Sequence, residues 1–372
     1  RYVGRMPLRI LLLADTHLGF DLPLTPRIRR RRRGPDFLAN HRRALGPALR
    51  GEVDLVVHGG DVFHRARPHH TLVAQAFAPL LEVADRGISV FVVPGNHERS
   101  RIPHARFASH PLVHVFDRPR AFDLEVAGQR VALLGFPYER HLVRRRLPEL
   151  VQATGWRPRE DTTSLLCVHH CFEGATVGPA DFTFRRGPDV IRGRDIPRGV
   201  TAVLTGHVHR HQVLTADLDG RPLAAPVIYP GSTERTAFAE KDEPKGYVIL
   251  HVDRTAGPRA PTVRWHFHAL YARPMVLADV RGDGPDPSAL DRQIRLALAR
   301  APADAVLRLR IHGRLSRGSR ALLATHRLRA LAPPEMNVEA WLVDEPRRAG
   351  RPSSLQVTQE RRAARRVPQG RA

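Results

Sequence analysis

The chain of 372 residues has few cysteines and no long hydrophobic run. Its two cysteines, Cys167 and Cys171, cannot build the disulfide framework of a small secreted protein, and so low a count fits a reducing compartment. A stretch of about 18 apolar residues, as a membrane-spanning helix requires, does not occur. The apolar run 10–14 is too short for a secretory signal. We therefore expect a globular protein of the cytoplasm.

Lysine is nearly missing as well. Lys241 and Lys245 are the only two, yet 60 basic residues face 37 acidic ones and give a formal net charge of +23. Such an excess favours a polyanionic partner, and nucleic acid is the commonest one. A basic surface without any such partner is the alternative.

The two cysteines flank His169 and His170, an arrangement that could be mistaken for a zinc site. A structural zinc site needs four ligands, and no second cysteine pair completes one. We interpret Cys167 as a small buried residue within a strand.

Strand-like and helix-like segments alternate over the first 110 residues, and this order predicts parallel strands with helices packed outside. Asp36 is the expected N-cap of the first helix. Strands predominate after residue 110, where Asp219-Gly220 indicates a hairpin turn. The mixture predicts two sheets packed face to face with helices outside. The expected helices are 37–49, 68–85, 139–152, 287–300 and 320–331, and the first strands are 8–14, 53–58 and 88–93.

The pattern begins again near residue 272 with a compact strand–helix–strand–helix–strand unit. After residue 345 Pro, Arg, Gly and Ser dominate, which indicates a disordered basic tail. We therefore expect three parts: a catalytic domain at 1–271, a small domain at 272–345, and a tail at 346–372.

Short polar motifs follow the ends of five strand-like runs. The carboxyl ends of parallel strands share one edge of a sheet, so side chains placed there can converge. Together the motifs supply carboxylate, amide and imidazole ligands, which suit manganese, iron or zinc better than calcium. The motifs are Asp15-Thr16-His17, Gly60-Asp61, Gly95-Asn96-His97-Glu98, His169 and Gly206-His207-Val208-His209.

Counting ligands gives two neighbouring divalent metal ions. Asp61 can bridge them because a carboxylate has two oxygens. His170 is an alternative to His169, because adjacent strand residues face opposite ways but a strand end can bulge. The expected ligands are Asp15, His17, Asp61 and His209 for one ion, and Asp61, Asn96, His169 and His207 for the other.

The five motifs resemble those of the calcineurin-like metallophosphoesterase superfamily, whose pattern D-x-H, G-D, G-N-H, H and G-H-x-H is complete here. The resemblance covers about the first 270 residues. It implies an α/β fold, a four-layer α-β-β-α sandwich with a smaller C-terminal α+β capping domain. It also implies that His97 is a catalytic residue that aids the leaving group or the transition state, rather than a metal ligand.

Longer strings are similar to one branch, the DNA double-strand-break repair exonucleases of SbcD type. They are Asp15-Thr16-His17-Leu18-Gly19, the string from Gly60-Asp61-Val62-Phe63-His64 to Pro68, and the string from Tyr229-Pro230-Gly231 to Arg235. This resemblance implies that His64 helps to place the scissile phosphate and that the small domain shapes the DNA path. It further implies two manganese ions, degradation of DNA ends, nicking of hairpins, a homodimer, and an SbcC-type coiled-coil ATPase subunit as partner. Only the tail is available where that branch has its ATPase-binding helices, so the ATPase partner stays open.

Arginines near the first two motifs are candidate contacts for a DNA backbone. For the run of five arginines at 29–33, a solvated loop without any DNA contact is the alternative. The candidates are Arg29, Arg30, Arg31, Arg32 and Arg33, followed by Arg65 and Arg67.

Two other functions compete with a DNA nuclease. One is a phosphoesterase that acts on a small-molecule phosphodiester or phosphomonoester. The other is a DNA-end scaffold without activity, although every expected ligand type is present. The net charge, the Gly-Asp-Val-Phe-His string and the additional domain favour the nuclease.

Overall fold

The computed structural model describes residues 7–21, 32–98, 110–254, 261–283 and 286–343. It divides into two compact units. Of the described residues, unit 1 comprises those up to Val276 together with Pro302–Val306 and Pro333–Asn337, and unit 2 comprises Leu277–Ala301, Leu307–Ala332 and those from Val338 onward. Within the described ranges, every helix is too short or too polar to span a membrane.

Unit 1 contains two six-stranded sheets. The first has the order β16-β15-β1-β2-β3-β4, and its strands β1 to β4 pair in parallel. The second has the order β13-β14-β12-β7-β6-β5, with a parallel centre formed by β14, β12, β7 and β6. The strands of the first sheet are β1 (Leu8–Leu13), β2 (Leu55–His58), β3 (Ser89–Val92), β4 (Val113–Val115), β15 (Lys245–Asp253) and β16 (Thr262–Leu270). Those of the second are β5 (Arg120–Val126), β6 (Gln129–Gly135), β7 (Thr162–Val168), β12 (Ala202–Thr205), β13 (Gln212–Ala216) and β14 (Pro222–Tyr229).

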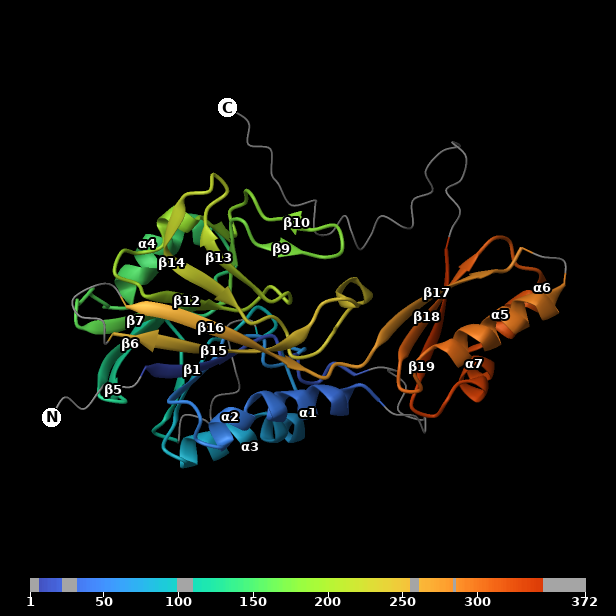
Figure 1. The fold of residues 1–372 in the computed structure, drawn as a ribbon, viewed down its shortest axis with the longest axis horizontal. Coiled ribbons are helices and arrows are strands. Elements are labelled where there is room, and N and C mark those ends of the chain that lie inside the picture. Colours follow the sequence, from blue (N-terminus) through green and yellow to red (C-terminus); the bar gives the residue numbers. More distant parts are fainter. Residues whose placement is uncertain (1–6, 22–31, 99–109, 255–260, 284–285, 344–372) are drawn as a thin grey trace. The chain divides into compact units, whose positions relative to one another are not determined.

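Alternate side chains of each strand build the layers of unit 1. In β1, Ile10 and Leu12 pack in the core between the two sheets, whereas Leu11 and Leu13 pack in the core beneath the first helices. Burial of each such side chain contributes about 1.5–3 kcal/mol. Figure 1 shows α1 to α3 over one sheet and α4 over the other. This arrangement confirms the predicted α/β class and the four-layer α-β-β-α sandwich. The helices are α1 (Gly34–Ala44), α2 (Gly46–Leu49), α3 (His70–Asp85) and α4 (Val143–Ala153).

A three-stranded sheet of order β17-β18-β19 and three helices form the last part of the described chain. Most of these residues belong to unit 2. The elements follow the predicted strand–helix–strand–helix–strand order, except that the second helix is divided in two. They are β17 (Met275–Arg281), α5 (Pro287–Arg300), β18 (Val306–His312), α6 (Arg317–Leu322), α7 (Thr325–Leu331) and β19 (Asn337–Leu342).

Two details of the first predicted helix are wrong. The helix is divided into α1 and α2, because Pro47 has no N–H to continue the hydrogen-bond ladder. Asp36 is not its N-cap. It lies in the first turn of α1, is buried, and pairs with the Arg273 guanidinium at 3.3 Å.

The connection from β7 to β12 contains four strands of two residues that were not predicted. Segments this short show no periodicity in the sequence. β8 pairs in parallel with β11, and β9 pairs with β10 in an antiparallel ladder. They are β8 (Cys171–Phe172), β9 (Thr176–Val177), β10 (Phe182–Thr183) and β11 (Val190–Ile191), and a 3-10 turn, η2 (Gly193–Asp195), follows them.

Candidate metal centre

The predicted ligands lie where five parallel strands end. Asp15 and His17 follow β1, Asp61 follows β2, and Asn96 follows β3, all in the first sheet. His169 follows β7, and His207 and His209 follow β12, in the second sheet. The structure brings the two sets together: ligand atoms of Asp15, Asp61 and His169 lie within 4.8 Å of one another, and so do those of Asp15, His17 and His209.

Asp61 lies between two groups of imidazoles. Its Oδ2 is 3.4 Å from His169 Nε2 and 3.9 Å from His17 Nε2. A carboxylate in this position can reach two ions at once, as expected for a bridging ligand. On one side, His17 Nε2 and His209 Nε2 lie 2.9 Å apart, so two imidazoles face a common point.

Asn96 completes the other group. Its Oδ1 lies 3.1 Å from His169 Nε2 and 2.8 Å from His207 Nδ1. The three side chains thus present an amide oxygen and two ring nitrogens to one place. These three residues belong to the set that the sequence predicts for the second ion.

The backbone at the site is strained. Asp15, His17, Asp61 and His207 have φ values of 51°, 42°, 52° and 78°, in the left-handed region that residues with side chains seldom adopt. Such strain costs about 1–3 kcal/mol at each residue and persists where the surrounding fold imposes it. Its concentration at four predicted ligands is typical of a functional site.

Glycines allow the loops to approach each other. A Cβ atom on Gly95 would lie 2.2 Å from Asp61 Oδ1, and one on Gly60 would lie 2.3 Å from His169 Nδ1. Neither position can accept a larger residue without moving a predicted ligand.

Hydrogen bonds on the far side of the rings fix how the imidazoles point. His169 Nδ1 lies 2.8 Å from the Gly59 carbonyl oxygen, and His209 Nδ1 lies 3.0 Å from Glu240 Oε1. Each contact leaves Nε2 of the same ring facing the cluster. Contacts of this kind orient metal-binding histidines and raise their basicity.

The two buried carboxylates of the site need positive charge near them. Asp15 and Asp61 are 0% and 2% exposed, and within the described residues no Lys or Arg pairs with either carboxylate. Burial raises the pKa of Asp15, which measures the cost of its charge. Burial would also raise the pKa of Asp61, but His169 outweighs it and holds that pKa below its usual range. Asp61 in turn overcomes the effect of burial on His169 and raises its pKa to about 9.

The donor set therefore fits a pair of divalent ions. The carboxylates supply negative charge, and burial together with His209 keeps the pKa of His17 well below its usual value, so this ring is neutral and able to coordinate. Asp15, His17, Asp61 and His209 could hold one ion, and Asp61, Asn96, His169 and His207 the other.

His97 and His64 lie at the edge of this cluster. Ligand atoms of His17, His64 and His97 lie within 4.8 Å of one another. His97 Nδ1 is 2.7 Å from the His64 carbonyl oxygen, and its Nε2 is 3.8 Å from Asp61 Oδ2. The His97 side chain is 32% exposed, unlike the buried His169, so a substrate can reach it.

His170 points away from the cluster. Its ring stacks on Tyr138, with centroids 4.9 Å apart, and its Nε2 accepts a hydrogen bond from the Glu139 amide. The structure therefore offers His169, and not His170, as the candidate ligand.

Glu98 connects two of the loops. Its carboxylate accepts hydrogen bonds of 2.7 Å from the amides of Phe63 and Gly95, and it is buried. Burial and the nearby Asp61 raise its pKa to about 8. Glu98 thus holds the loop after β2 against the loop after β3, next to Asn96 and His97.

The arginines that were predicted to contact DNA differ in where the structure places them. Arg33 is 1% exposed and its guanidinium pairs with Glu234 at 3.2 Å, so the expectation that it contacts DNA at the surface is corrected. Arg32 pairs with Asp21 and, together with the exposed Arg65 and Arg67, lines a hollow of about 400 Å³ beside Leu18. Arg29, Arg30 and Arg31 lie outside the described residues.

Glu240 belongs to the site but was not predicted from the sequence. It lies 31 residues after His209 in a short 3-10 turn, η3 (Phe238–Glu240), and it binds both that ring and the Lys245 ammonium. No motif or spacing marks it, because the contact arises only when the strands around it are packed.

Comparisons with known proteins agree with this geometry. Residues 8–211 match the family described as calcineurin-like phosphoesterase. The chain is 31% identical over 247 residues to the DNA double-strand break repair protein Mre11 of Haloferax volcanii, a match that covers 65% of this chain and 49% of that protein. It is 27% identical over 219 residues to the metallophosphoesterase YhaO of Bacillus subtilis, which covers 58% of this chain and 49% of that protein.

Mre11 of Thermoplasma acidophilum is 25% identical over 252 residues, covering 63% of this chain and 58% of that protein. The chain thus spans about half the length of the curated relatives that it matches. A solved structure of a dimetal phosphatase from Danio rerio aligns with a TM-score of 0.40 and 14% identity, covering 69% of this chain and 98% of that one.

Proposed function

The chain belongs to the calcineurin-like phosphoesterase family, and from this premise we propose that it is a DNA nuclease dependent on two divalent metal ions. In this proposal it hydrolyses phosphodiester bonds at DNA ends during repair, as an exonuclease and endonuclease. The observation that carries the proposal is the position of Asp61, whose Oδ2 faces His169 at 3.4 Å and His17 at 3.9 Å.

The chain's own residues would hold the ions and the substrate. Asp15, Asp61 and the imidazoles around them fix the ions, and the strained loops keep these groups in place before substrate arrives. When bound, a pair of such ions polarises phosphoryl oxygens, activates water and stabilises the leaving oxygen. We propose manganese for both positions.

His97 and His64 act on the substrate in this proposal. His97 is a partly exposed imidazole at the mouth of the cluster, and its ring is oriented by the His64 carbonyl oxygen. It can donate a proton to the leaving oxygen, a contribution typically worth about 10²–10⁴ in rate. His64 is half-buried beside it, with ring centroids 5.4 Å apart, and would position the scissile phosphate.

Two observations favour DNA over a small phosphoester. The net charge of +23 suits a polyanion. The archaeal relatives are named DNA double-strand break repair proteins. We further propose that residues 1–271 form the nuclease domain, that 272–345 shape the DNA path, and that the protein acts as a homodimer with an SbcC-type ATPase.

The test compares two substrates. The purified chain, loaded with manganese, is given labelled linear and hairpin duplexes, and in parallel bis-p-nitrophenyl phosphate. We expect cleavage of all three, loss of activity with a chelator, and two metal ions per chain. Hydrolysis of the dye ester without any cleavage of DNA would instead support a small-molecule phosphoesterase.

Asp61→Asn is the decisive variant, because it removes the proposed bridging charge while preserving the shape of the side chain. Asp85→Asn, an exposed residue at the end of α3, is its matched control. DNA cleavage unchanged in Asp61→Asn would contradict the proposed mechanism.

A further inference from the structure

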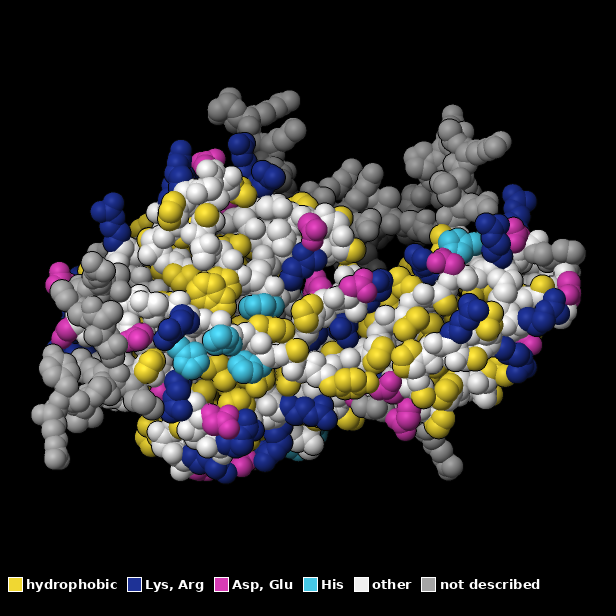
Figure 2. Space-filling view, in the orientation of Figure 1, with side chains coloured by type: hydrophobic (Ala, Val, Ile, Leu, Met, Phe, Trp, Pro, Cys, Tyr) yellow, Lys and Arg dark blue, Asp and Glu magenta, His cyan; other side chains and the backbone are white. Residues whose placement is uncertain are grey.

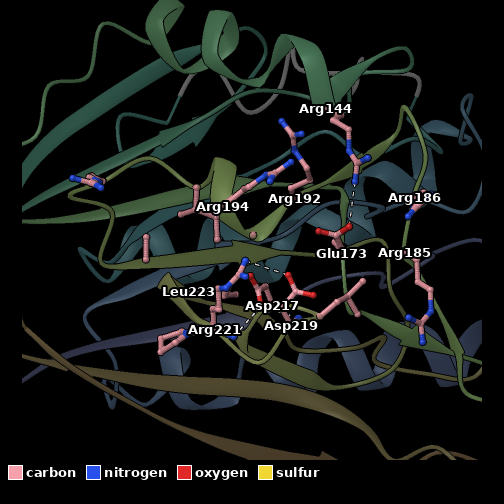
Figure 3. A pocket seen from close by; sticks show the side chains of 16 residues that line it. Arg144, Glu173, Arg185, Arg186, Arg192, Arg194, Asp217, Asp219, Arg221 and Leu223 are labelled. Atoms are coloured by element: carbon pink, nitrogen blue, oxygen red, sulfur yellow. Dashed lines mark hydrogen bonds and ion pairs between the residues drawn. The ribbon is translucent and has the colours of Figure 1, made fainter.

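An arginine-rich site lies in unit 1, apart from the candidate metal ligands. It is a pocket of about 810 Å³ between the connection from β7 to β12 and the turn of the β13–β14 hairpin. Seven arginines and three carboxylates line it, and none of the candidate metal ligands does. Figure 3 shows arginine side chains reaching toward this pocket from several sides.

Three of these arginines already have carboxylate partners. Arg144 pairs with Glu173, Arg192 pairs with Asp195, and Arg221 pairs with Asp219. Their charges are therefore largely balanced within the protein.

The other four are Arg185, Arg186, Arg194 and Arg198. All are exposed, and within the described part of the chain none forms an ion pair or a side-chain hydrogen bond. Like charges gathered around one hollow repel each other, and an anion between them removes that repulsion. The pocket is thus suited to a ligand with several negative charges.

The chemistry of the lining indicates phosphates. The planar guanidinium donates paired hydrogen bonds that match the oxygens of a phosphate. Among the residues that the structure describes, no aromatic side chain lines the pocket, so these residues offer no surface on which bases could stack. The apolar lining consists of aliphatic groups such as Ile196, Leu218 and Leu223, which can pack along sugars. A ligand recognised here would be held through its backbone.

The pocket is also connected to the metal centre through the chain and through hydrogen bonds. All four unpaired arginines lie between His169, at the end of β7, and the start of β12, which leads to His207. The connection is fixed to the segment after His209, because Gln212 Oε1 accepts the Thr176 amide at 2.8 Å and Arg210 donates to the Gly178 carbonyl oxygen at 2.6 Å.

We propose that this arginine pocket binds the phosphate backbone of a DNA strand outside the metal centre, without selecting its sequence. The identity of the ligand rests on the proposed function, since DNA is the proposed substrate. The pocket would anchor the substrate on the connection from β7 to β12. Each of these two strands leads to candidate metal ligands.

The test removes the four free charges together. Arg185, Arg186, Arg194 and Arg198 are changed to Gln in one full-length variant. A matched variant changes four other exposed arginines of unit 1, Arg42, Arg50, Arg86 and Arg118, to Gln and lowers the net charge equally. Binding of labelled duplex and single strands is measured by fluorescence anisotropy over a range of salt, in chelator.

The salt dependence gives the expected result. Each lost phosphate contact reduces the steepness with which log K falls against log salt by about 0.9, so four lost contacts reduce it by about 3.6 for duplex DNA. We expect this decrease and an affinity loss of about tenfold or more in the pocket variant, with much smaller changes in the matched variant. Equal behaviour of the two variants would overturn the inference.

Hydrolysis of bis-p-nitrophenyl phosphate separates this inference from the proposed function. We expect the pocket variant to hydrolyse the dye ester as the parent does. A parent chain that binds DNA through the pocket but never cleaves it would refute the nuclease and leave the pocket standing. A parent that cleaves DNA, with a pocket variant that binds as tightly, would refute the pocket alone.

A second measurement needs no variant. The parent chain is treated with phenylglyoxal, with and without DNA, and modified arginines are located by mass spectrometry. DNA should protect Arg194 and Arg198 more than Arg42 and Arg118. Equal protection by DNA at all four positions would overturn the proposal.

Discussion

Glu240 Oε1 lies 3.0 Å from His209 Nδ1, and this contact turns the Nε2 atom of the ring toward His17 and Asp15. Burial would raise the pKa of Glu240, but His209 and Lys245 outweigh it and keep that pKa below its usual value. The carboxylate is therefore ionised while it holds the ring. A negative charge behind a metal-binding imidazole fixes the ring and strengthens its donor atom.

Glu240→Gln should weaken metal binding by about 10- to 100-fold, the usual effect of losing such an outer contact. Isothermal titration with manganese and the metal dependence of dye-ester hydrolysis would measure it. Glu243→Gln is the matched control, since Glu243 also pairs with Lys245, at 3.1 Å, but does not contact His209. Equal losses in the two variants would show that the Lys245 charge, and not the orientation of the ring, sets the affinity.

Gly95→Ala should abolish most activity, because the new Cβ would lie 2.2 Å from Asp61 Oδ1 and 2.4 Å from the Asp61 amide nitrogen. Overpacking of this kind costs about 1–3 kcal/mol and forces backbone shifts, here at the proposed bridging ligand. Dye-ester hydrolysis and thermal unfolding would be measured together.

Gly46→Ala is the matched control, because it adds the same methyl group at a position away from Asp61. Its Cβ would meet only the end of the Arg50 side chain, at 3.0 Å, and this group can move aside. Activity in Gly95→Ala comparable to that in Gly46→Ala would mean that the loops tolerate displacement of Asp61.

The layers and the cluster could be predicted because both depend on local pattern. Apolar runs ending in polar motifs give the strands, and parallel order places their ends at one edge, which brought Asp15, Asp61 and His169 together. The order of elements after residue 272 was predicted from the same kind of pattern, and the helix expected at 287–300 is α5, which the Asp286 side chain caps.

What the sequence could not reveal are contacts across long distances in the chain. A run of five arginines looks solvated, yet Arg33 is buried because Glu234 meets it across 201 residues. Glu240 and the unpaired arginines of the pocket depend in the same way on how connections pack. Two-residue strands such as β8 and β11 form only because the partner segment is already held.

His97→Gln should reduce DNA cleavage by about 10²–10⁴-fold, because the variant cannot exchange the proton that the proposed mechanism requires. Metal content should stay at that of the parent, since His97 is not among the proposed ligands. His266→Gln, on the exposed face of β16, serves as control and should be active. A variant that loses metal together with activity would instead place His97 among the ligands.

Both thiols should be unreactive in the folded protein. Cys167 and Cys171 are 0% and 5% exposed, and burial raises the pKa of Cys171 to about 12 and that of Cys167 further. Only the thiolate reacts appreciably, so Ellman's reagent at pH 8 should detect almost no thiol natively and two after denaturation. Rapid native labelling would show that the strand end bearing His169 opens in solution.

Stability should fall in mild acid, in part because of His41. This ring in α1 is buried, lies 2.9 Å from the Ala76 carbonyl oxygen, and has its pKa lowered to about 4 by burial. Between about 6.5 and about 4 the unfolded chain binds a proton at this residue that the folded chain does not, so the free energy of unfolding decreases as pH falls. From pH 7 to pH 5 this residue alone accounts for about 2 kcal/mol. Urea unfolding of the parent and of His41→Gln at both pH values measures it: other buried histidines such as His58 act in both proteins, so the difference isolates His41, and parallel pH profiles would refute the assignment.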